Sequence, residues 1–157
     1  MPDSQMQRLR QLMHKTNQAS YLQVVLTPIT LKKSALKKLQ IGDIIPLNTP
    51  TIELLLLDNS TILAKAEYGL LEKQPSIYIS SIQTDNELLP TQKEKKYKQI
   101  LLSLGRIKKE QLLLDSTLIL EKTSSYDIEL YDKERVVAEA NFVVFESGVG
   151  VQVERVE

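Results

Sequence analysis

The sequence repeats one pattern of apolar residues at a constant spacing, and this repeat constrains the fold more than any other feature. The pairs that share one sequence separation are Ala64 and Ala138, Ile77 and Val151, and Ile82 and Val156. Leu47 and Leu120 are closer by a single position, as a short loop insertion would give. Two copies of one module usually pack on each other. The repeat therefore favours a role in assembly over a role in catalysis.

Length and composition fit a globular protein with one ordinary domain or two small ones. The chain has 157 residues, of which 42% are hydrophobic and 25% are charged, as is usual for such proteins. A unit of about 70 residues has only a marginal core, so two units gain by burying surface on each other. Lys plus Arg and Asp plus Glu both number 20, so the formal net charge is zero. A general nucleic-acid binder needs a basic surface, and we therefore expect no nucleic-acid partner.

The sequence lacks the residue patterns of the common catalytic and metal sites. It has no cysteine and a single histidine, His14, which argues against cysteine chemistry, zinc sites and a Ser-His-Asp triad. Its five glycines form neither GxGxxG nor a phosphate-binding loop. The carboxylate pairs Asp43/Glu67 and Asp127/Glu139 fall at predicted strand edges and turns, where solvated charge is the usual role. We therefore predict no enzyme activity, no catalytic or metal-binding residue and no cofactor.

No segment of the sequence has the pattern of a membrane span or of a signal peptide. The longest apolar run, Ile52–Leu57, is interrupted by Glu53 and is far too short to cross a bilayer. The N-terminal residues lack the apolar core of a signal peptide. We therefore expect a cytoplasmic protein.

The chain divides into four predicted segments. They are an N-terminal helix or arm (1–20), a first β-rich module (21–82), a linker (83–96) and a second β-rich module (97–157). Met6, Leu9, Leu12 and Met13 follow helical spacing, which predicts the N-terminal helix. The linker is polar and charged and contains Pro90. The predicted fold class is mainly β with short helices.

The first module is predicted to contain several short strands and one short helix. The strands are expected at Tyr21–Leu26, within Ile41–Leu47 after a turn at Gly42-Asp43, and at Ile52–Leu57, Ile62–Tyr68 and Ile77–Ile82. Leu31, Ala35 and Leu39 have the spacing of one helical face. Residues 58–60, Asp-Asn-Ser, are typical of a tight hairpin turn.

The second module repeats much of this order. Strands are expected at Asp115–Leu120, around Ile128 and Leu130, at Arg135–Phe145, and from Val149 to Glu154. Ile100–Leu104 fits either a strand or the start of a helix. Residues 132–134 and 147–148 are predicted to be turns.

The strand Ile52–Leu57 is apolar on both faces, because four leucines follow one another from Leu54 to Leu57. A strand of this kind is normally covered on both sides. Burying Leu55 and Leu57 would contribute roughly 3–6 kcal/mol, which matters against a typical total stability of about 5–15 kcal/mol. The second module is the natural cover.

The motifs of both halves resemble the SpoA (surface presentation of antigens) domain of the flagellar switch proteins FliM and FliN and of their type III secretion counterparts. In the first half the matching segments are Leu39–Leu47, Ile62–Glu67 and Ser76–Ile82; in the second they are Leu104–Arg106, Val136–Asn141 and Gly150–Val156. Ala66 replaces the usual glycine, and the stretch from Arg106 to Leu120 is shorter than usual. The likeness covers residues 21–82 and 97–156. Two such modules in one chain most resemble the C-terminal part of the type III secretion sorting-platform (C-ring) protein.

The resemblance implies two SpoA-like β modules packed as an intertwined pseudo-two-fold pair, exchanging strands across the axis. Here the pair would form within one chain, with residues 83–96 as the strap. Fourteen flexible residues span roughly 20 Å, and a tethered partner has an effective concentration of about millimolar. Pairing within the chain should therefore outcompete pairing between chains.

The resemblance also implies a function. It is that of a non-enzymatic scaffold or adaptor subunit of a flagellar motor switch or type III secretion cytoplasmic ring. The partners implied are other SpoA-domain proteins of the FliM/FliN kind, an ATPase-linked stator protein of the FliH kind, and further copies of the chain. The expected location is the cytoplasmic face of the inner membrane, without insertion into it.

Five apolar residues near the module ends are the predicted protein-interface residues. They are Leu55, Leu57, Val143, Phe145 and Val151. The alternative for each is a place in the ordinary core.

Two other function classes stay open at this point. Swapped-hairpin β modules with Gly-Asp turns also resemble AbrB-like DNA-binding proteins, although the zero net charge argues against them. The other is an enzyme of unknown type, for which the sequence offers no site.

Overall fold

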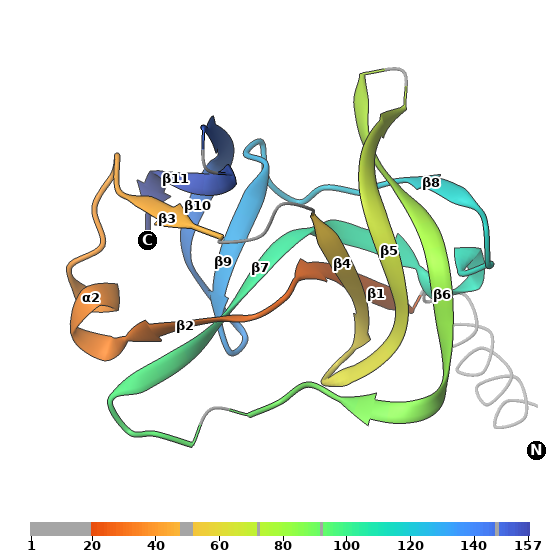
Figure 1. Ribbon diagram of the computed structural model, residues 1–157, viewed down its shortest axis with the longest axis horizontal. Helices are drawn as coiled ribbons and strands as arrows, with labels where there is room; N and C mark the ends of the chain where they lie inside the picture. The colour runs from red at the N-terminus through yellow and green to blue at the C-terminus, as the bar shows by residue number, and fades with distance from the viewer. Residues whose placement is uncertain (1–19, 48–51, 72, 92, 147) are drawn as a thin grey trace, which may run out of the picture.

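The described part of the chain is built almost entirely from β-strands, in agreement with the predicted fold class. The structure is a computed structural model that describes residues 20–47, 52–71, 73–91, 93–146 and 148–157. Its strands form one antiparallel sheet in the order β3-β11-β10-β9-β7-β1-β4-β5-β6-β8, and β2 also pairs with β7 (Figure 1). The predicted N-terminal helix lies outside the described residues.

The described residues of the first half form six strands and one short helix. They are β1 (Tyr21–Leu26), β2 (Ile29–Lys32), α2 (Lys33–Lys37), β3 (Ile44–Pro46), β4 (Glu53–Asp58), β5 (Thr61–Leu71) and β6 (Gln74–Leu88). Pro28 separates β1 from β2 because it has no backbone N–H to donate to a ladder. The predicted hairpin turn lies between β4 and β5, where Asn59 has a φ of +56°, a conformation that asparagine tolerates well.

In the second half, the residues that the structure describes form five strands and one short 3-10 helix. They are β7 (Tyr97–Lys108), η1 (Lys109–Gln111), β8 (Thr117–Ile119), β9 (Ile128–Asp132), β10 (Arg135–Phe145) and β11 (Gly148–Val156). The ambiguous segment Ile100–Leu104 is therefore a strand. Lys133 has a φ of +59° in the turn between β9 and β10, at the position equivalent to Asn59.

The first part of the predicted linker is a strand, because β6 continues through Gln83 to Leu88. Thr61 pairs with Leu88 and Ile62 with Glu87, so the beginning of β5 holds this extension. Most of its side chains face solvent, which explains a polar sequence that is typical of a linker. The connection that remains, residues 89–96 between β6 and β7, is called the strap below.

Each strand on this path has a counterpart in the other half: β1 matches β7, β4 matches β9, β5 matches β10, β6 matches β11, and β8 matches β3. The order of matched strands is therefore the same when the sheet is followed from either edge. At the two edges, the halves exchange strands. Ile45 of β3 pairs with Val151 of β11, so a first-half strand joins the second half. Leu118 of β8 pairs with Ile77 of β6, so a second-half strand joins the first half. The two pairings have equivalent registers.

The turns before the exchanged strands are equivalent as well. The Gly42 N–H donates to the Val153 carbonyl at 2.8 Å, and the Asp115 N–H donates to the Ile79 carbonyl at 2.9 Å. Gly42 and Asp115 both have positive φ angles, +96° and +63°. The turn before β3 and the turn before β8 therefore share the positive φ angle and the same kind of backbone hydrogen bond.

The halves meet in the middle of the sheet, where β1 and β2 pair with β7. This pairing is symmetric about one pair of equivalent residues. Val25 pairs with its counterpart Ser103. The pairings on either side of them are reciprocal: Leu22 with Ile107, and Ile29 with Ile100. The sequence separation of Val25 and Ser103 also relates Leu22 to Ile100 and Ile29 to Ile107.

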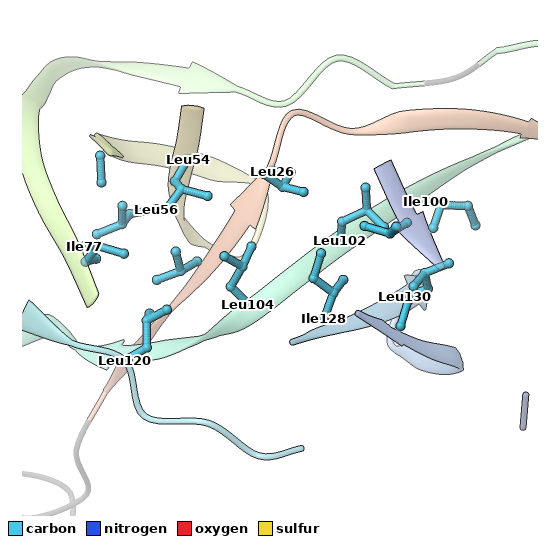
Figure 2. Packing of buried hydrophobic residues seen from close by; sticks show 14 of the residues in the cluster. Leu26, Leu54, Leu56, Ile77, Ile100, Leu102, Leu104, Leu120, Ile128 and Leu130 are labelled. Atoms are coloured by element: carbon cyan, nitrogen blue, oxygen red, sulfur yellow. The ribbon is translucent and has the colours of Figure 1, made fainter. Parts of the chain in front are cut away.

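The main core is continuous through both halves. Figure 2 shows Leu54 and Leu56 with Ile77 on one side, Ile128 and Leu130 on the other, and side chains of β7 between them. All five of these residues are fully buried. Neither half therefore encloses a main core of its own.

A second, smaller cluster lies on the opposite face of β4, which confirms that this strand is covered on both sides. It consists of buried Val25, Leu57, Ile62 and Leu89, with Leu55 and Leu101 packed against it. The second half supplies Leu101 to this cover. The strap supplies Leu89, which the sequence did not single out.

Candidate interaction surface

The β10–β11 hairpin carries two of the predicted interface residues, Val143 and Phe145. Val143 pairs with Gly150, and Phe145 pairs with Gly148 at the end of the hairpin. The Phe145 ring lies over Gly150, since a Cβ built on that glycine would come within 2.8 Å of the ring atom Cε2. The absence of a side chain at Gly150 therefore allows Phe145 to lie against the hairpin.

Val144, which the sequence did not single out, is the most exposed large apolar residue among the described ones. Its side chain is 82% exposed, whereas Phe145 is 38% exposed and Val143 is half-buried. The run Val143-Val144-Phe145 is apolar throughout, and this pattern could have indicated that an apolar side chain is exposed here. It did not reveal that the hairpin extends beyond the core.

The β5–β6 hairpin repeats this arrangement in the first half. Leu71, equivalent to Phe145, is 42% exposed. Three residues before the ends of β5 and β10, the Tyr68 and Phe142 rings contact each other, with centroids 5.5 Å apart. Figure 1 shows both hairpin ends at the top of the view. The exposed residues Val144 and Phe145 are called the hairpin patch below.

The other predicted interface residues lie elsewhere. Leu57 and Val151 are buried, the first in the small cluster and the second in the main core beside β3. Leu55 is half-buried against the small cluster. The structure thus brings Leu55 and Leu57 together and Val143 and Phe145 together, but it does not join these pairs. Leu57 and Val151 have no surface to offer a partner.

A hydrogen-bond network fixes the middle of β10 and the segment before β9. The Asp127 carboxylate accepts a hydrogen bond from the Phe142 N–H at 3.0 Å, and the Asp127 N–H donates to Asn141 Oδ1 at 3.0 Å. Burial and, secondarily, the nearby Asp127 charge raise the pKa of Tyr68. Glu139 accepts a hydrogen bond from Ser124 Oγ at 2.6 Å. Asp127 and Glu139 are therefore tied into the fold, and the expectation that they are merely solvated charges was wrong.

A cleft of about 870 Å³ lies beside the strap, and we call it the strap cleft. Its described lining is strongly charged and includes Lys33, Lys93, Lys95, Lys98, Lys133, Glu94, Asp132 and Glu134. The Lys33 N–H donates to the Lys96 carbonyl at 2.9 Å, which brings α2 to the strap. Lys93, Lys95 and Lys98 belong to one charged run of the sequence, and the fold adds Lys33 and Lys133 from distant segments.

The described residues contain no group of three or more His, Cys, Asp or Glu side chains that could hold a metal ion. Within the same ranges, no helix combines the length and the apolar character needed to cross a bilayer.

Comparison with known proteins gives no family assignment. No protein-family model matches the sequence, and no curated protein matches it.

Proposed function

We propose that this chain is a non-enzymatic scaffold subunit of a cytoplasmic ring in a flagellar motor switch or a type III secretion system. In this proposal, its two halves are SpoA-like modules intertwined about a pseudo-two-fold axis. They act through contacts with other SpoA-domain proteins and with an ATPase-linked stator protein. The chain would lie at the cytoplasmic face of the inner membrane without inserting into it.

The exchange of edge strands is the first support for this proposal. β3 completes the second half and β8 completes the first, with equivalent registers around Ile45 and Leu118. A sequence resemblance to an intertwined family predicts this kind of exchange. Two unrelated domains joined by a linker would have no reason to show it.

The hairpin patch is the observation that carries the functional part of the proposal. Apolar surface on a monomer that lies beyond its own core often marks a binding site for another protein. Val144 is 82% exposed and Phe145 lies next to it in a defined position over Gly150. The patch is therefore both accessible and held in shape, and fixed apolar anchors are typical of protein interfaces.

The proposal is tested by measuring the binding of the full chain to a FliN-like protein and to a FliH-like protein by biolayer interferometry. Val144→Asp places a charge in the patch without touching the core. We expect it to lower affinity for at least one of the two proteins by about tenfold or more, which corresponds to about 1.4 kcal/mol. Leu88→Asp is the matched control, because Leu88 is 64% exposed on β6 outside the patch.

Two outcomes would contradict the proposal. If the unmodified chain binds neither class of protein, the chain is not a ring subunit of this kind. If it binds and Val144→Asp binds equally well, the hairpin patch is not the interface. Circular dichroism of both variants verifies that each change leaves the fold intact.

A further inference from the structure

The strap beside the large cleft is attached to the sheet at both ends. Leu89 is buried in the small cluster, and its N–H donates to the Ser60 carbonyl at 2.9 Å. Gln99 Nε2 donates to the Pro90 carbonyl at 2.5 Å. At the other end, the Lys33 N–H holds the Lys96 carbonyl. The described ends of the strap are therefore held in place before any ligand binds, and this limits the entropy that binding would cost.

Positive charge dominates the rim of the strap cleft. Lys98 forms an ion pair with Asp132 at 2.6 Å, which leaves four other lysines against two glutamates in the described lining. The lysines are Lys33, Lys93, Lys95 and Lys133, and the glutamates are Glu94 and Glu134. Lys32, Lys37 and Lys38 add exposed positive charge around α2. A chain with zero net charge thus concentrates lysine at one place.

The cleft also has apolar and aromatic parts. Leu89 and Leu101, which belong to the small cluster, contribute to its lining. Tyr97 and Tyr131 line it as well. A ligand that carried only charge would leave these groups uncovered. The lining fits a ligand that combines negative charge with apolar side chains.

We infer that the strap cleft binds an acidic, partly apolar peptide segment of a partner protein. A phosphate backbone is disfavoured because Asp132, Glu134 and Glu94 lie among the lysines and would repel a continuous row of phosphates. Carboxylates on a peptide can be spaced to avoid these groups. This inference concerns a surface apart from the hairpin patch, and it does not depend on the proposed function.

The test uses the full chain and a fluorescein-labelled peptide of alternating glutamate and leucine, followed by fluorescence anisotropy. The variant Lys33→Glu/Lys95→Glu reverses two charges of the cleft lining, where α2 meets the strap. We expect its affinity for the peptide to fall at least about tenfold. The control Lys65→Glu/Lys73→Glu changes the net charge by the same amount at exposed lysines outside the cleft, and we expect it to bind almost as the unmodified chain does.

The specificity of binding is tested with two further probes, an alternating lysine–leucine peptide and a single-stranded oligothymidine. The inference is supported if the acidic peptide binds, the other two probes do not, and the binding weakens at high salt. Equal loss of affinity in both double variants would overturn it, because binding would then follow net charge only. Tighter binding of the oligothymidine, lost in the cleft variant, would also overturn it in favour of nucleic acid. If the acidic peptide does not bind the unmodified chain at all, the inference is also overturned.

Discussion

Tyr68 and Phe142 meet with ring centroids 5.5 Å apart and planes inclined by 49°. They have the same sequence separation as Ala64 and Ala138 and occupy equivalent positions on β5 and β10, so the two long hairpins touch through equivalent residues. The contact joins the halves near the hairpin patch, in addition to the pairing of β1 with β7. The contact therefore helps to hold the two hairpins in place relative to each other.

The first prediction concerns this ring pair. Tilted aromatic contacts of this geometry contribute about 0.5–1.5 kcal/mol beyond the area that they bury. A double-mutant cycle of Tyr68→Leu and Phe142→Leu, measured by urea unfolding, should give a coupling free energy in this range. Strictly additive single changes would show that the rings lie together without stabilising each other.

The second prediction concerns Gly105, whose φ is +145°. A Cβ at this position would lie 2.7 Å from the Glu121 carbonyl oxygen, which is backbone and cannot move aside freely. Gly105→Ala should therefore lower the free energy of unfolding by about 1–3 kcal/mol. Gly69→Ala is the control, because its Cβ would meet only Ser76 Oγ at 3.7 Å. Equal effects of the two changes in thermal unfolding would contradict this account.

The third prediction concerns the cooperativity of folding. Leu56 and Leu130 are fully buried, one in each half, in a single main core. Leu56→Ala and Leu130→Ala should each cost about 2–5 kcal/mol, and each variant should unfold in one transition with an unchanged slope in urea. Two separated transitions in either variant would mean that the halves fold independently.

The fourth prediction concerns pH. The Tyr78 hydroxyl donates to Asp115 Oδ1 at 2.6 Å, and this hydrogen bond is the main cause that raises the pKa of Tyr78 above its ordinary 10.0. Since the raised pKa favours the protonated phenol, the contribution of this bond to stability is complete below pH 10.0 and is lost as pH rises through the pKa of the folded state.

Asp115→Asn tests this bond without disturbing the turn, because asparagine tolerates the positive φ of Asp115. The pKa of Tyr78, followed by NMR of tyrosine labelled at Cζ, should fall towards 10.0 in this variant. Lys133→Asn, in the other turn with positive φ, should leave it unchanged. An unchanged Tyr78 pKa in Asp115→Asn would show that the Asp115 carboxylate does not control it.

Local sequence patterns predicted most of the strands and turns, because these depend on near neighbours. The turns at Asn59 and Lys133 follow from polar residues between apolar runs. The cover on both faces of β4 follows from four consecutive leucines. Neither inference needs knowledge of which strand pairs with which.

The less local features were harder to predict. The extension of β6 to Leu88 depends on pairing with the beginning of β5, which its polar side chains do not reveal. Leu89 in the small cluster depends on the path of the strap. Val143 and Phe145 were selected as apolar residues near the module ends, but the apolar pattern could not separate the buried Val151 from the exposed Val144. That distinction depends on where the hairpin leaves the core.

The exchange of β3 and β8 has a consequence for how such a fold can be encoded. Every strand pairing described above is independent of the covalent link between Pro90 and Tyr97. Cutting the backbone there would preserve the sheet and remove only the proximity that the link provides. Two separate polypeptides can therefore build the same architecture. When they are fused into one chain, the two halves are always present in equal amounts.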